Sequence, residues 1–565
     1  MRRIIFSSVL LAAVGGSLLA QPVVNDGGIL NAASYASAKL PSGAIAQGSI
    51  FVVFGARMGP AAIMQAGFPL PSTLAGTSVK VSSGGQSLDC PLVYTLAGQL
   101  AAILPSATPV GNATLTVSFN GQTSVARNFK VVASSFGTFS VNSAGSGPGI
   151  VQNYESASSV PLNSVLKSAK PSQTLILYGT GLGALPAGSA DNSAAPAAAI
   201  NQSQVELYVG STKAAVAYAG RAPGFAGLDQ INFIVPGGIS GCAVPVLIKI
   251  GSVVSNATTI AIAPNGGACS DPLGLSSSQL ERLSNGGTLK IGGIVLARVA
   301  FDLSVAGFNI STTIDTGSAT FQEFTAQTIG SSSSLNAGGT PSIGTCTTYS
   351  GTSSQPVDPI QPKGLDAGMQ INVNGPKGAK IMEKVPNLLG DYGATFAQAT
   401  GGISIPGAGG GSDPYLEPGT YRFDNGAGGA DVKSFTASYT QPTNLNWTNK
   451  AAVVNVARAS GQIATWSGGD PTGYVMIFGY SSSDTTDAAV NGYFICVEQA
   501  SKGSFTVPAA VLLTLPPSPT GGGFGVPVGF FAVGAIPTPA TFTASGIDIG
   551  TISSTSLSGK TVTYQ

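Results

Sequence analysis

Short segments in which apolar and polar residues alternate recur along this chain. Leu115, Val117 and Phe119 alternate with polar residues and are followed by Asn120–Gly121. Alternation with a period of two is typical of a β-strand with one buried face, and an Asn-Gly dipeptide favours a hairpin turn. Similar short strands follow one another through the N-terminal half without a helical period, which predicts antiparallel β-sandwiches.

A repeat divides the N-terminal half into two modules. The segment 98–105 returns as the segment 229–236, and each copy has an apolar strand upstream of it. Recurrence of this kind indicates two β domains built to one plan. We place the first domain at residues 28–133 and the second at residues 134–270.

Two more β-rich domains are expected after a connector. At residues 271–287 the pattern changes: Ser276 can cap a short helix there. Alternation returns at residues 288–435, interrupted by Gly- and Ser-rich loops, and again at residues 436–565, where we expect a β-sandwich. The predicted fold class is therefore all-β, with tandem sandwiches followed by two β-rich domains.

The composition agrees with this prediction. Charged residues make up only 9% of the 565 residues, and the chain contains 77 Gly and 36 Pro. A hydrophobic content of 43% is too high for a disordered chain. Many short strands joined by Gly and Pro turns account for both observations.

The charge balance and the absence of histidine exclude several functions. A net charge of +1 leaves no basic surface to attract nucleic acid. Without histidine, the chain can form no Ser-His or Cys-His catalytic pair. Asp413, Asp484 and Asp487 do not match the spacing of an EF-hand calcium loop. We therefore expect no nucleic-acid partner, no cofactor and no metal.

The N-terminus is typical of a secretory signal peptide. Arg2 and Arg3 precede an apolar run that ends at Ala20, where we predict cleavage. The alternative is an uncleaved membrane anchor, but the run is near the lower limit for a span and no stop-transfer pattern follows. We expect residues 1–20 to be removed, the mature protein to be secreted or displayed at the cell surface, and no membrane span to remain.

Five motifs in the N-terminal half resemble a paired module of uncharacterised secreted acidobacterial proteins. They are Asn31–Tyr35, Phe54–Gly55, Leu70–Gly76, Tyr178–Gly183 and Ala222–Asn232. Each half of that module is similar to the immunoglobulin-like IPT/TIG fold. The resemblance implies two immunoglobulin-like sandwiches and an adhesion, carbohydrate-binding or spacer role, and it supplies no catalytic residue.

The five cysteines are expected to form disulfides in an exported chain. Cys242 and Cys269 bracket a predicted strand pair, so we expect them to be bonded. The sequence leaves the pairing of the other three open. A bridge between Cys346 and Cys496 would leave Cys90 as a buried free thiol.

One motif suggests acid catalysis. Asp315, in an Asp-Thr-Gly sequence, looks like the active-site aspartate of aspartic proteases, which need two such carboxylates to share a proton. The chain has no second Asp-Thr-Gly, so this chemistry would require a homodimer. The other interpretation, which we favour, is a turn between strands.

The last domain is rich in aromatic residues. If some of these rings were exposed in a row, they could stack on sugars; the candidates are Trp447, Trp466 and Tyr480, with Tyr474, Phe478, Tyr493 and Phe494. The other interpretation is that they form the domain core, because large rings bury much apolar area.

We therefore predict a secreted or surface-displayed β protein that acts as a binding, adhesion or structural module without catalysis. Its expected partner is an extracellular polysaccharide or a surface protein. One alternative is a dimeric aspartic-protease-like hydrolase that uses Asp315. A second alternative is a spacer or anchor for a C-terminal carbohydrate-binding domain.

Overall fold

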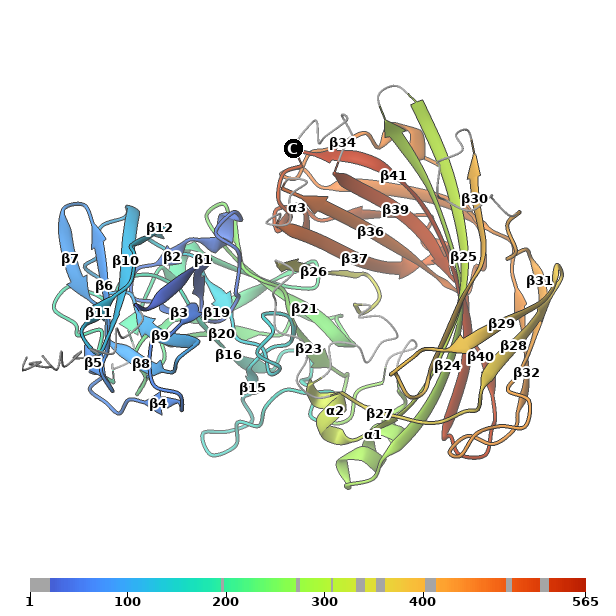
Figure 1. Cartoon of the computed structure of the whole chain (residues 1–565), viewed down its shortest axis with the longest axis horizontal. Helices are drawn as coiled ribbons and strands as arrows, with labels where there is room; N and C mark the ends of the chain where they lie inside the picture. Colours follow the sequence, from blue (N-terminus) through green and yellow to red (C-terminus); the bar gives the residue numbers. More distant parts are fainter. Residues whose placement is uncertain are drawn as a thin grey trace, which may run out of the picture.

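The structure is a computed structural model, and Figure 1 shows two β-sandwiches beside a large curved sheet. Nearly all of its regular structure is β-strand, which confirms the all-β prediction. The predicted signal peptide, Asp484 and Asp487 lie outside the described residues. The described residues are 21–194, 198–270, 275–305, 308–331, 341–351, 361–401, 413–483, 490–518 and 528–565.

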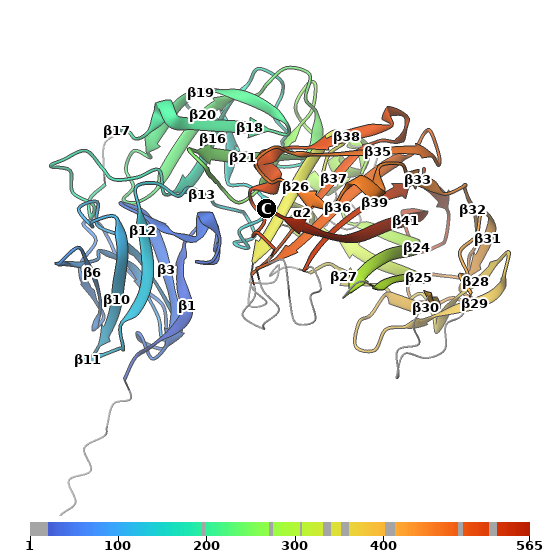
Figure 2. The same cartoon turned by 90° about the horizontal axis from the view of Figure 1, so that it is seen from above.

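The first sandwich packs two sheets with the strand orders β1-β3-β9-β8-β4 and β2-β12-β10-β6-β5, seen at the N-terminal end in Figure 2. Phe51, Leu100 and Leu115 are fully buried between them. The predicted Asn120–Gly121 turn joins β10 to β11, and both of its residues have positive φ. The strands are β1 Val23–Asn31, β2 Ile45–Ala46, β3 Ile50–Ala56, β4 Met64–Gln65, β5 Thr73–Leu74, β6 Thr77–Ser83, β7 Gln86–Asp89, β8 Leu92–Thr95, β9 Gln99–Ile103, β10 Gly111–Phe119, β11 Gln122–Thr123 and β12 Arg127–Val132.

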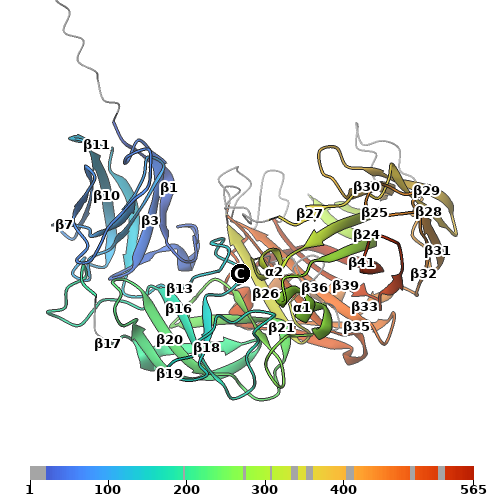
Figure 3. The same cartoon turned by 90° about the horizontal axis from the view of Figure 1, so that it is seen from below.

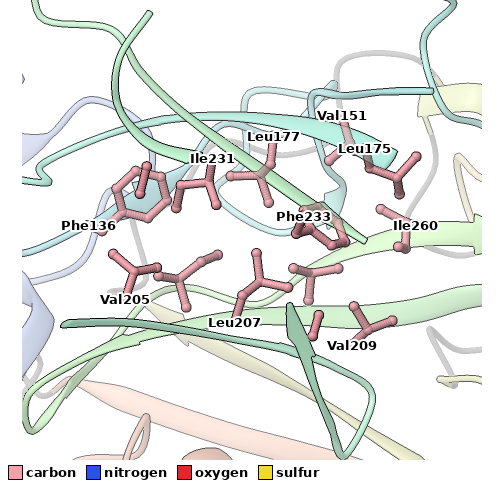
Figure 4. Packing of buried hydrophobic residues seen from close by; sticks show 14 of the residues in the cluster. Phe136, Val151, Leu175, Leu177, Val205, Leu207, Val209, Ile231, Phe233 and Ile260 are labelled. Carbon is pink, nitrogen blue, oxygen red and sulfur yellow. The ribbon is translucent and has the colours of Figure 1, made fainter. Parts of the chain in front are cut away.

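The second sandwich follows directly and gives the tandem arrangement that the repeat predicts. Its strand β19 serves both layers, because one part pairs with β18 and the other with β20. Figure 4 shows the two layers facing each other, with Leu177 and Ile231 opposite Val205 and Leu207. The strands are β13 Gly137–Thr138, β14 Gly147–Pro148, β15 Val151–Asn153, β16 Thr174–Thr180, β17 Ala198–Ala199, β18 Val205–Val209, β19 Thr212–Arg221, β20 Asp229–Ile234, β21 Gly241–Ile250, β22 Val253–Val254 and β23 Thr258–Ile262.

The motifs behind the family resemblance meet between the two sandwiches. Asn31 donates hydrogen bonds from Nδ2 to the backbone oxygens of Ser135 and Thr180, each over 3.2 Å. The Ile50 amide donates to Thr180 Oγ1 over 2.8 Å, and this hydroxyl donates to the Gly227 carbonyl over 2.7 Å. These buried bonds fix how one sandwich sits on the other.

The C-terminal half is built on one 15-stranded sheet, ordered β26-β37-β36-β39-β41-β24-β25-β30-β29-β28-β31-β32 along its main path. The last strand, β41, runs parallel to the first, β24, and pairs with β39 on its other side. The sheet therefore continues across the boundary that the sequence predicts between residues 435 and 436. Local alternation could not show this pairing, because β24 and β41 lie at opposite ends of the segment.

The strands of this half comprise those of the large sheet and a small three-stranded sheet, β33-β35-β38. They are β24 Leu289–Val305, β25 Phe308–Phe324, β26 Thr345–Gly351, β27 Lys363–Gly364, β28 Gln370–Gly375, β29 Gly378–Lys384, β30 Asp391–Gly401, β31 Gly419–Asp424, β32 Thr436–Gln441, β33 Leu445–Trp447, β34 Asn455–Val456, β35 Gln462–Gly468, β36 Tyr474–Ser482, β37 Asn491–Gln499, β38 Ser504–Val507, β39 Gly529–Ile536, β40 Ala540–Phe542 and β41 Ile549–Tyr564.

Two hydrophobic cores lie on the same face of the large sheet. The first includes Phe321 and Phe423 and is enclosed by β24, β25 and the strands from β28 to β32. The sheet curls until Tyr439 on β32 reaches Ser554 on β41, over 2.8 Å between the hydroxyl oxygens. The second core includes Phe531 and lies between the large sheet and the small sheet. Two cores therefore share one sheet.

A short helix connects the second sandwich to the large sheet, as the sequence predicts. Ser276 caps α1 in a full capping box with Gln279. Leu280 and Leu283 pack against residues of the second sandwich and against Leu289 on β24, and Figure 3 shows α1 between these parts. On length and hydropathy, none of the helices in the described residues could pass through a lipid bilayer. The helices are α1 Ser277–Ser284, α2 Ala326–Ser331 and α3 Ala509–Leu512, with 3-10 turns at Pro41–Gly43, Gln202–Gln204, Lys450–Ala452 and Ala500–Lys502.

Two disulfides are present. Cys242 is bonded to Cys269, as expected, and Cys346 is bonded to Cys496. The second bridge joins directly opposite residues of β26 and β37. Cys90 is a buried free thiol in the core of the first sandwich.

Candidate functional site

Seven neighbouring strands of the large sheet carry no charged side chain on one of their two faces, among the described residues. Seven neighbouring strands, from β26 through β37, β36, β39, β41 and β24 to β25, pair in continuous register. Alternate residues of paired strands therefore lie on the same face. We name the side without charge the uncharged face. All charged residues of these strands lie on the other face: Lys290, Arg298, Asp302, Asp315, Glu323, Glu498 and Lys560.

Aromatic rings form a row across four strands of the uncharged face. Tyr349 on β26 stacks on Tyr493 on β37, with ring centroids 4.8 Å apart. Phe478 on β36 follows, 6.0 Å from Tyr493, and Phe530 on β39 lies 6.2 Å from Phe478. Tyr480 joins the row, because it is directly opposite both Tyr493 and Phe530. We call these five residues the aromatic row.

The rings of the aromatic row are half-buried, and neighbouring side chains hold them in place. Tyr493 is 36% exposed, and burial raises the pKa of its phenol. The Tyr480 hydroxyl donates to Asn491 Oδ1 over 2.7 Å. A glycine is needed at Gly559 on β41, because a Cβ there would overlap the Phe530 ring. The rings are therefore held in place by neighbours on the same sheet.

The ring planes limit how a ligand can be bound. Tyr349 and Tyr493 lie within 21° of parallel, and Phe478 is tilted by 31° against Tyr493. When rings stack on one another, each covers part of its neighbour's face, so that part is not open to a ligand. A ligand would meet inclined rings and hydroxyl groups rather than a flat platform.

The two tryptophans among the binding candidates lie in the core, which is the second of the two interpretations given above. Trp447 and Trp466 are each only 5% exposed and pack in the second core, behind the sheet. Their indole N–H groups are satisfied: Trp447 donates to Asn449 Oδ1 and Trp466 to the Ala500 carbonyl, each over 2.8 Å. Of the three candidates, Tyr480 lies on the uncharged face.

Asp315 lies in the middle of β25, so the expected turn is wrong. Its side chain is fully buried, and its two oxygens accept hydrogen bonds from Arg298 Nε and Nη2 over 2.8 and 2.9 Å. The backbone amides of Tyr415 and Leu416 also donate to Oδ2, over 2.6 and 2.8 Å. The hydrogen bond to Asp315 in turn raises the pKa of the Arg298 guanidinium. A carboxylate with this many donors has no oxygen left to activate water.

Sequence reasoning missed Tyr349 and Phe530. Both belong to the row only because β26 and β39 pair with β37 and β36. The residues 524–536 are a short apolar run, which predicts a buried strand and does not mark Phe530 as accessible. Alternation in each strand was visible in the sequence, but the register between strands was not.

Comparisons with known proteins do not identify the chain. No family model and no curated protein matches it. Among solved structures, domains 5-6 of the S-layer protein SbsC match at 11% sequence identity with a TM-score of 0.17. The match covers 43% of this chain and 98% of that chain. Domains 4-9 of SbsC match with 9% identity, 94% of this chain, 83% of that chain and a TM-score of 0.17. The Bacteroides ovatus protein SGBP-B, in complex with a mixed-linkage heptasaccharide, matches with 9% identity, 80% of this chain, 90% of that chain and a TM-score of 0.13. TM-scores this low do not establish a shared fold.

Proposed function

We propose that this chain is an extracellular binding protein without catalytic activity, and that its uncharged face binds a neutral polysaccharide. The observation that carries the proposal is the segregation of charge: seven charged residues of seven paired strands lie on one face, and the aromatic row lies on the other. A face of this kind offers apolar contact and hydroxyl hydrogen bonds without attracting ions.

Neutral polysaccharides match these properties. Their sugar rings present C–H groups that pack on aromatic rings, and their hydroxyls pair with Tyr, Thr and Asn side chains. Large aromatic rings contribute most of the apolar contact area at such surfaces. The inclined rings of the row would contact successive sugars along a chain that crosses the strands.

Two features support an extracellular location. The N-terminal sequence is typical of a signal peptide, and two disulfides are expected only in an oxidising compartment. The tandem sandwiches would then serve as a spacer next to the large sheet, whether the chain is secreted or displayed at the cell surface. The resemblance of their motifs to the IPT/TIG-type module is consistent with such a spacer role.

The protease alternative has weaker support. It would need Asp315 exposed beside a second carboxylate, whereas Asp315 is buried and paired with Arg298. We therefore favour binding over hydrolysis.

Affinity electrophoresis of the mature protein in gels containing single polysaccharides tests the proposal. We expect at least one neutral polysaccharide to retard the protein, and Tyr493→Ala with Phe478→Ala to remove most of the retardation. Tyr154→Ala is the matched control, because Tyr154 is 44% exposed on the second sandwich, outside the uncharged face. Retardation by charged polysaccharides alone, or an unchanged double variant that melts like the wild type, would contradict the proposal.

A further inference from the structure

Two adjoining cavities lie where the second sandwich meets the large sheet. The first has a volume of about 440 Å³ and the second about 300 Å³. Four residues line both cavities: Gly210 and Ser211 from the β18–β19 turn, and Gly344 and Thr345 at the start of β26. The cavities therefore meet at this turn.

The first cavity is polar but uncharged. Its side chains include the hydroxyls of Ser211, Thr212, Ser240 and Ser270 and the amide of Gln499, and no charged residue lines it. Within the described part of the chain, these five side chains make no hydrogen bond to another residue. They are free to bond a ligand with several hydroxyl groups.

The second cavity is mainly apolar. Leu247 on β21 faces Phe505, Pro508, Val511 and Leu513, which lie on β38 and around α3. One cation, Lys249, reaches this cavity, and its Nζ lies 3.3 Å from Glu206 Oε1. Because that charge is already paired, the cavity favours an uncharged apolar group.

A disulfide lies in or beside the wall of each cavity. Gly241 and Ser270, next to the bonded Cys242 and Cys269, line the first cavity, and the bonded Cys346 lines the second. A hydrogen bond links the second sandwich to the segment that leads into β26 of the large sheet. The Ala243 amide donates it to Ser342 Oγ over 3.1 Å. A site held in this way loses little conformational entropy on binding.

We propose that the two cavities together bind one neutral amphiphile, with a sugar-like head in the polar cavity and a short alkyl or aryl group in the apolar one. Both volumes are in the range of small-molecule sites, about 300–1,000 Å³. The inference does not depend on the aromatic row, because none of the five residues of the row lines either cavity.

Calorimetric titration with hexyl β-D-glucopyranoside, below its micelle concentration, tests the site on the mature full chain. We expect saturable one-to-one binding at least tenfold tighter than that of glucose alone or hexanol alone. Hexanol binding as tight as the glycoside, or no saturable glycoside binding, would overturn the proposal.

A matched pair of turn variants locates the site. Ser211→Trp places a ring at the meeting point of the cavities, and we expect it to weaken glycoside binding at least tenfold. Ser252→Trp is the control, because Gly251–Ser252 is also an exposed two-residue Gly-Ser turn on the same sandwich and lines neither cavity. Equal binding by the two variants would overturn the assignment. Tyr493→Ala should bind the glycoside normally, which separates this result from the test of the uncharged face.

Discussion

The guanidinium of Arg221 lies 2.7 Å from the carboxylate of Asp229, and both side chains are fully buried. Asp229 Oδ2 also accepts hydrogen bonds from the amides of Gly181 and Leu182, over 2.7 and 2.8 Å. Burial raises the pKa of the Asp229 carboxyl to about 6 against the lowering effect of Arg221 and these amides, so this carboxyl is ionised at neutral pH. This ion pair joins two motifs, Tyr178–Gly183 and Ala222–Asn232, that carry the family resemblance. In this chain, the contacts of these two motifs hold the second sandwich together.

Replacing one partner of this pair should strongly destabilise the second sandwich. Arg221→Met leaves a buried carboxylate without its counter-ion, which typically costs about 3–5 kcal/mol. Arg221→Met with Asp229→Asn should recover part of that loss, because the charge is gone while the amide oxygen still accepts from Gly181 and Leu182. Denaturant unfolding followed by far-UV circular dichroism measures the free energy of unfolding of the wild type, the single variant and the double variant. A double variant less stable than Arg221→Met would contradict the argument.

Removal of the two disulfides should lower the free energy of unfolding by different amounts. In the chain-entropy model, a bridge across 27 residues stabilises by about 3.5 kcal/mol and one across 150 residues by about 5 kcal/mol. We therefore expect Cys346→Ser with Cys496→Ser to lower the free energy of unfolding more than Cys242→Ser with Cys269→Ser. Urea unfolding at neutral pH measures the free energy of unfolding of both double variants. A reductant should have no further effect on a variant that lacks all four cysteines, and the reverse order would contradict the model.

These examples show how far the sequence could predict the structure. The strands of the first sandwich, the Asn120–Gly121 turn and the capped helix at Ser276 are local features, and alternation and turn chemistry reveal them. The Cys242–Cys269 bridge was also expected, because its residues bracket neighbouring strands.

The candidate site was less predictable, since it depends on pairing between distant strands. The sequence favours the core for Trp447 and Trp466, and the structure places both there, on β33 and β35 over the second core. Asp315 has a protease-like local sequence, but its partner Arg298 lies opposite it in the register of β24 and β25. No local pattern encodes that register.

Asp315→Asn should affect stability and no enzymatic activity. Arg298 is only 12% exposed, and without the Asp315 charge its nearest carboxylate is that of Glu417, 3.8 Å away and more exposed. Loss of a largely buried charge partner typically costs up to about 3–5 kcal/mol. We expect no peptide hydrolysis at acidic pH from either the wild type or the variant, and a clear loss of stability in thermal unfolding. Wild-type hydrolysis that Asp315→Asn abolishes would show that the chain is an acid protease after all.

Stability should fall in acid partly through Glu206, beside the apolar cavity. Its carboxylate accepts a hydrogen bond from the Tyr208 hydroxyl over 2.7 Å and lies 3.3 Å from both Lys213 and Lys249. The bond from Tyr208, with help from the two lysines, lowers the pKa of Glu206 to about 2 from an ordinary value of 4.5. A depressed folded-state pKa contributes stability above pH 4.5, and this contribution is lost as the pH falls towards 2.

The difference in melting temperature between the wild type and Glu206→Gln isolates this effect. We expect the wild type to be more stable at pH 6, and the difference to shrink steadily between pH 4.5 and pH 2. Because the group is partly exposed, high salt should reduce the difference at pH 6 as well. Glu383→Gln is the control, since Glu383 is an exposed carboxylate on β29 and should give a small difference at every pH. A difference for Glu206→Gln that is independent of pH would mean that Tyr208 and the lysines do not hold the ionised form.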